Sequence, residues 1–514
     1  MAAVPAAWSQ STRASVDTTV ARTQYGPVRG YRDRDVQVFK GVRYGADTRA
    51  RRFQTAQPPV PWTEPMPALE YGPAAPQTNP QEAVSEDCLF LNVWTPAVRS
   101  AERRPVMVYL HGGEYSHGSG SSPLYDGTHL ARDHDVVVVT VNHRLSALGH
   151  LFLASFDRAR FADSGNVGIW DLVMALRWIR DSIAAFGGDP ACVTLFGQSG
   201  GGAKIATLMS MSAARGLFHR AATMSGEQVT ASGPLAATHR AEAFLAALQL
   251  KSTQLDALVG TPLERLVGAS GSADPSILGS ALYFGPVLDE RGLTRHPFYP
   301  DAPAASLEVP MLIGTTHDET RFFFRDDFVR LETLSWEELP VRLAAEMRVD
   351  IDPGTVVETY RRLYPQASAG EVFFAATTAS RSWRPAIIEA EARASAGAPV
   401  HMYQLDWRSP LDGGRWRAAH TLDIPLVFGT VAAPGALSGA GREARSMADL
   451  MSTAFVNFAR SGSPQGPGMP AWPVYESDTR STLVFDLPPR VVNDPRAEER
   501  RLFARVPFLQ RGTT

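Results

Sequence analysis

The sequence lacks the features that mark several classes of protein. Only two cysteines, Cys88 and Cys192, occur in 514 residues, which is too few for a disulfide framework. No apolar run reaches the roughly 20 residues that a membrane-spanning helix needs. The first residues contain neither a basic segment nor a continuous apolar segment, so they do not resemble a secretory signal. We therefore expect a cytoplasmic protein that does not bind a membrane.

The chain also lacks a large excess of positive or negative charge. The chain has 50 Lys and Arg against 53 Asp and Glu, a formal net charge of −3, which leaves no electrostatic footprint for nucleic acid. It contains no HExxH, no spaced Cys/His cluster and no GxGxxG motif that opens a βαβ unit. We expect no metal and no organic cofactor. The composition is compatible with a monomer or a homodimer.

The residues that are present indicate an α/β protein. Hydrophobic residues make up 44% and charged residues 20% of the chain, as in ordinary globular enzymes. An amphipathic pattern predicts a helix over residues 168–187, and strands and helices alternate. Runs rich in β-branched residues predict buried parallel strands at residues 105–110, 135–142, 192–197 and 309–314. The predicted fold is a large, mostly parallel sheet with helices on both faces.

The chain shows no linker and no fixed-period repeat that would divide it. We expect a flexible tail at residues 1–17 and a single catalytic domain at residues 18–510. Within that domain, residues 20–45 predict an antiparallel meander, with turns at Tyr25-Gly26-Pro27 and Arg32-Asp33. Residues 320–400 are rich in helical patterns and predict insertions over the mouth of the site.

One short motif suggests chemistry. Residues 197–201 read Gly-Gln-Ser-Gly-Gly and fit G-x-S-x-G, between an apolar strand and a helical pattern. A sharp strand-to-helix turn would expose the Ser199 hydroxyl, and glycines on both sides leave room for the turn. The start of the helix would aim N–H groups at the site. The alternative is a glycine-rich loop without chemistry, so the rest of the chain has to supply the partners of a nucleophile.

A serine hydroxyl needs a base, and the base needs an acid that orients it. Asp318 and Glu319 both follow a predicted strand, and the local sequence does not decide between them. In the order serine, acid, histidine, only His401 and His420 remain for the base. His401 begins a strand-like run, whereas His420 lies in a loop and is preferred.

Donors for a developing oxyanion are the remaining requirement. The strand "PVMVYL" runs directly into His111-Gly112-Gly113-Glu114. Glycines allow the backbone to approach a substrate carbonyl and to point N–H groups at it. This loop is therefore the candidate oxyanion hole.

Motifs along nearly the whole chain resemble the type-B carboxylesterase family. They include "SEDCLFLNVWTP", "LHGGEY", "VTLFGQSGGG", "THDETRFF" and "AAHTLDIPLVFG", in the family's order. The resemblance implies an α/β-hydrolase fold and a serine esterase that needs no cofactor. It also implies Ser199 as nucleophile, Glu319 as acid and His420 as base.

The resemblance extends to residues around the triad. It implies that the backbone N–H groups of Gly113, Glu114 and Gly200 form the oxyanion hole. It further implies that Ser225 and Asp423 form a supporting pair beside the triad, and that Arg144 lies in a buried ion pair rather than in the chemistry.

Three departures from the family pattern stand out. Glu114 replaces a glycine of the oxyanion loop, and its carboxylate lies next to a site that develops negative charge. It either turns into a side pocket or selects substrates that carry an amine or another N–H donor. Gly200 stands where the family commonly has alanine. Cys88 occupies a half-cystine position, but the upstream partner cysteine is missing.

Aromatic residues near these motifs are candidates for the substrate pocket. They predict an uncharged aromatic or medium-sized apolar ester as substrate. Each could equally be part of the core. The candidates are Tyr115, Tyr283, Phe284, Phe323 and Trp416.

The predicted function is hydrolysis of carboxylic esters, with a small-molecule ester as partner. The first alternative is cleavage of aryl carbamates or anilides by the same triad. A remote alternative is an inactive, cholinesterase-like binding module, which the retention of Ser199, Glu319 and His420 disfavours.

Overall fold

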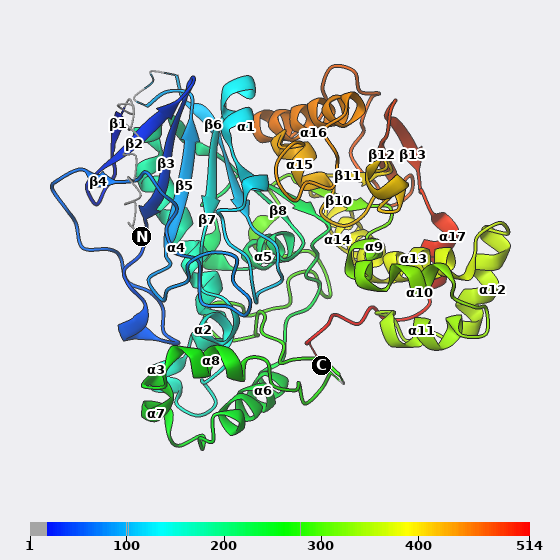
Figure 1. Cartoon of the computed structure of the whole chain (residues 1–514), viewed down its shortest axis with the longest axis horizontal. Coiled ribbons are helices and arrows are strands. Elements are labelled where there is room, and N and C mark those ends of the chain that lie inside the picture. Colours follow the sequence, from blue (N-terminus) through cyan, green and yellow to red (C-terminus); the bar gives the residue numbers. More distant parts are fainter. Residues whose placement is uncertain (1–17, 99, 101, 278, 514) are drawn as a thin grey trace, which may run out of the picture.

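The computed structural model describes residues 18–98, 100, 102–277 and 279–513. The tail expected at residues 1–17 lies outside the described residues. Within them, 13 strands form one sheet (Figure 1). The strands are β1 Thr18–Arg22, β2 Pro27–Asp33, β3 Val36–Arg43, β4 Met66–Pro67, β5 Phe90–Thr95, β6 Arg104–Leu110, β7 Val137–Val141, β8 Gly188–Gln198, β9 Arg220–Met224, β10 Met311–Thr316, β11 Val400–Leu405, β12 Ser481–Phe485 and β13 Arg490–Asn493.

The centre of the sheet is parallel. Strands β7, β6, β8, β9, β10, β11 and β12 pair in this order, each parallel to the next. Antiparallel strands β1, β2, β3 and β5 extend one edge, and β13 closes the other. The four buried strands predicted from sequence correspond to β6, β7, β8 and β10. The predicted meander is confirmed as β1–β3, although its second turn falls at Arg34-Asp35 rather than at Arg32-Asp33.

Seventeen α-helices are described. They are α1 Thr128–His134, α2 Ser146–His150, α3 Arg158–Phe161, α4 Val167–Ser182, α5 Gly200–Met209, α6 Pro234–Ala247, α7 Leu255–Val259, α8 Leu263–Ala269, α9 Thr320–Phe323, α10 Phe328–Glu332, α11 Leu339–Glu346, α12 Pro353–Leu363, α13 Ala369–Thr378, α14 Arg384–Ser395, α15 Asp423–Phe428, α16 Arg442–Ser461 and α17 Ala497–Phe503. None of these helices is long and apolar enough to cross a membrane.

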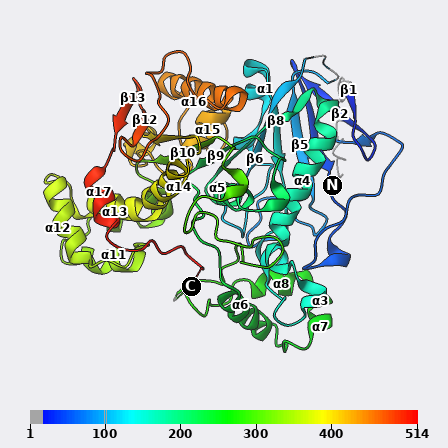
Figure 2. The same ribbon diagram turned by 180° about the vertical axis from the view of Figure 1, so that it is seen from behind.

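Two hydrophobic cores lie on opposite faces of the sheet, because successive side chains of a strand point to opposite sides. Val106 and Val108 of β6 pack into the core that α4, α5 and α14 cover. Met107 and Tyr109 of the same strand pack into the core under α1, α15 and α16. Figures 1 and 2 show the helices on the two sides of the sheet. The α/β fold with helices on both faces is therefore confirmed.

The helical insertions form a separate layer at one end of the molecule (Figure 1). Helices α10–α13 and α17 share their own hydrophobic core, which includes Phe328, Phe373 and Phe503. The C-terminal segment after α17 then runs past the end of α11 toward the body of the protein. On this path Leu509 N–H donates to the carbonyl of Arg348, in the insertion, at 2.9 Å. These contacts bring the insertion and the C-terminal segment to the same place.

Candidate active site

The candidate catalytic residues follow parallel strands at the carboxyl edge of the sheet, where open α/β sheets bind ligands. Ser199 follows β8 directly, and Glu319 comes three residues after β10. The glycine-rich loop that contains Gly113 follows β6, and Ser225 follows β9. Parallel strands place these loops beside one another although they are far apart in the sequence.

Ser199 has the backbone geometry of a strained turn. Its φ is 56° and its ψ is −128°, a combination that residues with a side chain rarely adopt. A Cβ on Gly201 would lie 1.9 Å from the Leu110 carbonyl oxygen, so only glycine fits there. The Ser199 N–H donates to the Met224 carbonyl at 2.8 Å, and α5 begins at the next residue. The sequence therefore builds a turn between β8 and α5 with its serine at the apex.

Glu319 and His420 form a buried pair. The carboxylate of Glu319 contacts His420 Nδ1, and its second oxygen accepts the Thr316 N–H at 2.7 Å. Glu319 is fully buried and His420 is 3% exposed. A carboxylate at Nδ1 favours the tautomer in which Nδ1 carries the proton, so that Nε2 is free to accept one.

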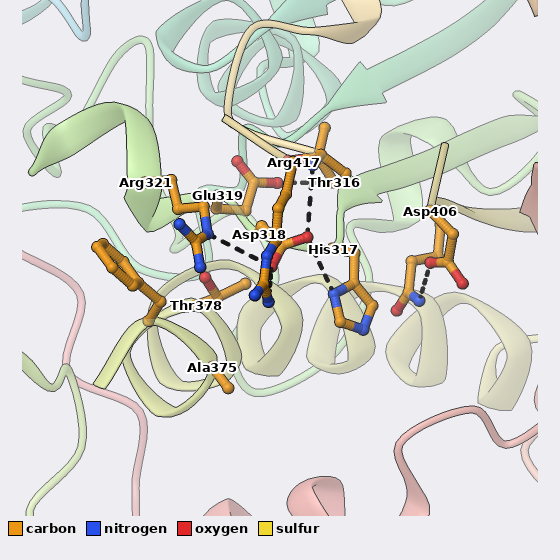
Figure 3. A network of polar contacts seen from close by, with 12 residues as sticks. Thr316, His317, Asp318, Glu319, Arg321, Ala375, Thr378, Asp406 and Arg417 are labelled. Carbon is orange, nitrogen blue, oxygen red and sulfur yellow. Dashed lines mark hydrogen bonds and ion pairs between the residues drawn. The ribbon is translucent and has the colours of Figure 1, made fainter. Parts of the chain in front are cut away.

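Asp318 faces a different set of groups, which decides between the two acids (Figure 3). Its carboxylate lies 3.3 Å from His317 Nδ1, 3.8 Å from Arg321 Nε and 3.9 Å from Arg417 Nη1. Burial raises the pKa of Asp318, but His317 and the two arginines outweigh this effect and lower it. Asp318 is therefore an ion-pairing residue of the turn between β10 and α9, and of these two acids it is Glu319 that contacts His420.

Gln198 is a residue that the sequence analysis did not single out. Its side-chain Nε2 donates to His420 Nε2 at 3.0 Å, and the side chain is buried. Ser199 and His420 line the same cavity, but within the described residues no hydrogen bond joins them. The only available signal was the place of Gln198 next to the serine, which does not specify where its amide points.

The candidate oxyanion loop lies against the start of α5. Gly113 has a φ of 83° and Glu114 a φ of 51°, so the loop turns sharply. A Cβ on Gly200 would lie 2.3 Å from the Glu114 carbonyl oxygen and 2.5 Å from its nitrogen. This close approach explains why glycine stands at position 200, because alanine would push the loop away.

A buried lysine supports the same loop. Lys204 on α5 is fully buried, and its Nζ donates to the His111 carbonyl at 2.9 Å. Burial lowers the pKa of Lys204 to about 7. The hydrogen bond ties the first residue of the loop to the helix that follows Ser199.

A cavity that is partly open to solvent adjoins Ser199 and His420. Tyr115, Tyr283 and Phe323 line it, as the sequence analysis expected. The Phe323 ring centroid lies 4.7 Å from that of His420. These side chains give part of the cavity an aromatic wall.

Two of the expected pocket residues lie elsewhere, and the prediction is corrected for them. Phe284 packs edge-on against Phe244, at a centroid distance of 6.1 Å, in a satellite core around α6. Trp416 packs against Phe328 and donates its Nε1–H to Asp412 at 2.6 Å. Proximity to a motif in the sequence did not indicate which way these rings point.

Ser225 and Asp423, the expected supporting pair, both lie near the triad. Among the described residues, no hydrogen bond joins them to each other. Among the described residues, the Ser225 hydroxyl has no hydrogen-bond partner, and it lines the cavity. The Asp423 carboxylate accepts a hydrogen bond from Tyr403 at 3.3 Å. Burial and the nearby Glu319 raise the pKa of Asp423 to about 7.

The cavity also has charged walls that the sequence analysis missed. Arg348, Arg381, Arg511 and Glu227 line it together with Glu114. No local pattern could have indicated this, since these residues come from five separate parts of the chain.

The turn at Ser199, the His420–Glu319 pair and the mostly parallel sheet define the class of protein, an α/β-hydrolase. The profile of the Carboxylesterase family matches residues 17–503. The chain is 36% identical to the para-nitrobenzyl esterase of Bacillus subtilis over 94% of this chain and 98% of that protein. It is 32% identical to the phenmedipham hydrolase of Pseudarthrobacter oxydans, over 95% and 97% of the two chains.

A solved structure agrees with these relatives. The carboxylesterase of Geobacillus stearothermophilus superimposes with a TM-score of 0.85 at 36% identity, over 94% of this chain and all of that one. The chain belongs to the carboxylesterase family and is an ester-hydrolysing serine hydrolase. The expected Arg144 ion pair is also present, with Asp171 at 2.7 Å, and both cysteines are unpaired.

Proposed function

We propose that the protein hydrolyses carboxylic esters of aromatic or apolar character through an acyl-enzyme on Ser199. The observation that carries the proposal is the His420–Glu319 pair, whose histidine lines the same cavity as Ser199. His420 Nε2 takes the hydroxyl proton as the oxygen attacks the ester carbonyl. Glu319 keeps the imidazole in its tautomer and stabilises the cation that forms.

The N–H groups of Gly113, Glu114 and Gly200 stabilise the tetrahedral oxyanion. Two of these groups lie at the positive end of α5 or directly against it, where negative charge is favoured. His420 then gives its proton to the leaving alcohol. A water molecule, activated by the same histidine, hydrolyses the acyl-enzyme and restores Ser199.

Gln198 has to move for the first step. Its amide occupies His420 Nε2 at 3.0 Å, which is the position that the Ser199 hydroxyl needs. Rotation of the Gln198 side chain on substrate binding would release Nε2 to the serine. Gln198 thus acts as a positioning residue that holds the imidazole in place between turnovers.

Paired substrates test the proposed reaction. We expect 4-nitrophenyl butyrate to be hydrolysed with a kcat/KM at least about 100-fold above that of the matching 4-nitroanilide, because an amine is a poorer leaving group than a phenol. Initial rates with the purified protein measure this. A faster anilide reaction would contradict the proposal.

A second candidate function is hydrolysis of aryl carbamates by the same residues. The observation that favours it is the similarity to a phenmedipham hydrolase over 95% of this chain. Including an aryl N-phenylcarbamate in the same rate comparison separates it from ester hydrolysis. An inactive binding module would hydrolyse none of the three substrates.

Gly200→Ala tests the oxyanion hole. The added Cβ meets Glu114 backbone atoms at 2.3–2.5 Å, so the loop has to move away and its N–H donors with it. We expect kcat to fall about 10- to 100-fold on aryl esters. Gly268→Ala is the control, because a Cβ there meets no atom within 4 Å. Equal activity of the two variants would contradict the assignment.

We expect a cytoplasmic protein that is a monomer or a homodimer. The low cysteine content favours the cytoplasm, and size-exclusion chromatography with light scattering would distinguish a monomer from a homodimer.

A further inference from the structure

The cavity beside Ser199 contains three arginines. Arg348 follows α11, Arg381 lies in the π-helical turn Ala379–Trp383 between α13 and α14, and Arg511 lies in the C-terminal segment. Single π-helical turns occur often at functional sites, where they redirect a side chain. Three parts of the chain thus contribute a guanidinium group to one small space.

Among the described residues, the three guanidinium groups have no anionic partner. Within the described residues, no carboxylate lies within 4.0 Å of any of them, and the side chains of Arg348 and Arg381 make no hydrogen bond. The guanidinium carbon of Arg381 lies over the Phe323 ring, 3.8 Å from its centroid. Arg511 donates to the Ser280 hydroxyl at 2.5 Å.

Arginines whose side chains are almost fully buried have partners in this chain. Arg393 donates to the Val309 carbonyl at 2.6 Å. Arg144 binds Asp171 and Arg240 binds Asp274, each at 2.7 Å. Buried charges normally have such partners, because desolvation without one is costly. The three cavity arginines are half-buried and have no carboxylate partner among the described residues, which indicates that an anionic partner arrives from outside.

The two glutamates of the cavity do not balance the three arginines. Burial raises the pKa of Glu227 well above its usual range, which favours its neutral form. Burial lowers the pKa of Arg348, and the nearby Glu114 carboxylate opposes this change. Burial also lowers the pKa of Arg381 to about 9, which leaves it charged at neutral pH. The cavity is thus positive, and the amine-selecting role considered for Glu114 is disfavoured.

We propose that the substrate carries a carboxylate in addition to the ester group under attack, and that Arg348, Arg381 and Arg511 bind this carboxylate. A planar guanidinium group matches a carboxylate with two parallel hydrogen bonds. The aromatic wall formed by Tyr283 and Phe323 packs against the apolar body of the same molecule. The inference rests on the proposed function and narrows its substrate class to half-esters and esters of hydroxy acids.

Two substrate pairs test which side of the ester bond carries the charge. The first pair is 4-nitrophenyl hydrogen adipate and 4-nitrophenyl hexanoate, which differ in a carboxylate on the acyl side. The second is 4-acetoxybenzoate and its methyl ester, which differ on the alcohol side. The quantity measured is the charge ratio, the kcat/KM of the charged ester divided by that of the neutral one.

The variants are Arg348→Gln and Arg381→Gln, with Arg330→Gln as the matched control. Arg330 is an exposed residue of the same insertion and does not line the cavity. We expect the charge ratio of at least one pair to fall about 10- to 100-fold in the two cavity variants. The ratio stays at the wild-type value in the control. Because it is a ratio, a general loss of activity cancels.

Salt provides a second measurement that needs no variant. Raising NaCl from about 0.05 to about 0.5 M should lower the wild-type charge ratio, because salt screens the attraction. A charge ratio that neither the cavity variants nor salt lowers, in either pair, would overturn the proposal. If no variant folds, the salt response of the wild type decides alone. Failure to hydrolyse even the neutral esters would instead refute the proposed function.

Discussion

Replacing Ser199 with alanine is expected to lower kcat/KM on aryl esters by about 10⁴-fold or more, because the acyl-enzyme can no longer form. A residual rate from the oxyanion donors and from substrate binding remains. The measurement is the initial rate with 4-nitrophenyl butyrate, together with a circular dichroism spectrum to establish that the variant is folded.

Ser382 provides the comparison, since this serine lines the same cavity. Ser382→Ala should lose less than about tenfold, as expected for a side chain that takes no part in bond formation. If the Ser382 variant were inactive and the Ser199 variant active, the nucleophile would be misassigned.

The second large loss of activity is expected when Glu319 is replaced. Glu319→Gln should lower kcat by about 10³- to 10⁴-fold, because a neutral amide neither fixes the His420 tautomer nor stabilises the imidazolium. The matched control is Asp318→Asn, the neighbouring residue with the same change of charge. Steady-state kinetics on one aryl ester measure both.

Asp318→Asn should keep activity within about tenfold but lose about 1–3 kcal/mol of stability, because Arg321 and Arg417 lose a buried acceptor. A thermal unfolding curve detects this loss. If Asp318→Asn abolished activity and Glu319→Gln did not, the roles given to the two acids would be reversed.

The choice between these acids illustrates what the sequence could and could not decide. Strand β10 and the position of the acids after it followed from an apolar run. Which of two adjacent side chains faces the histidine depends on the turn between β10 and α9, on Arg321 in α9, and on Arg417, which lies in the distant loop after β11. The resemblance to a family supplied the answer that local sequence did not contain.

Ser199 was the easier residue to predict. A strand, a glycine-flanked serine and a helix follow one another without interruption, so the pattern itself describes the turn. The parallel strands and the long helix α4 were predicted for the same reason, since their periodicity lies within one segment. Their ends moved by a few residues because hydrogen bonding to neighbouring elements sets the boundaries.

The residues that line the cavity were the hardest part of the structure to predict from the sequence. Phe284 and Trp416 were expected there because they stand near motifs, but each packs in another core. Arg348, Arg381 and Arg511 meet only after the insertion and the C-terminal segment fold together. Contacts between distant segments leave no period or spacing in the sequence, so this charge cluster could not be predicted.

The central claim is that Ser199 is an activated nucleophile. The most direct test is the mass of the intact protein after treatment with a small fluorophosphonate, followed by peptide mapping, with Ser199→Ala as the control. We predict one adduct on the wild-type protein, located on Ser199 and missing from the variant. A folded wild-type protein that takes up no adduct, or takes it up at another residue, would contradict the account.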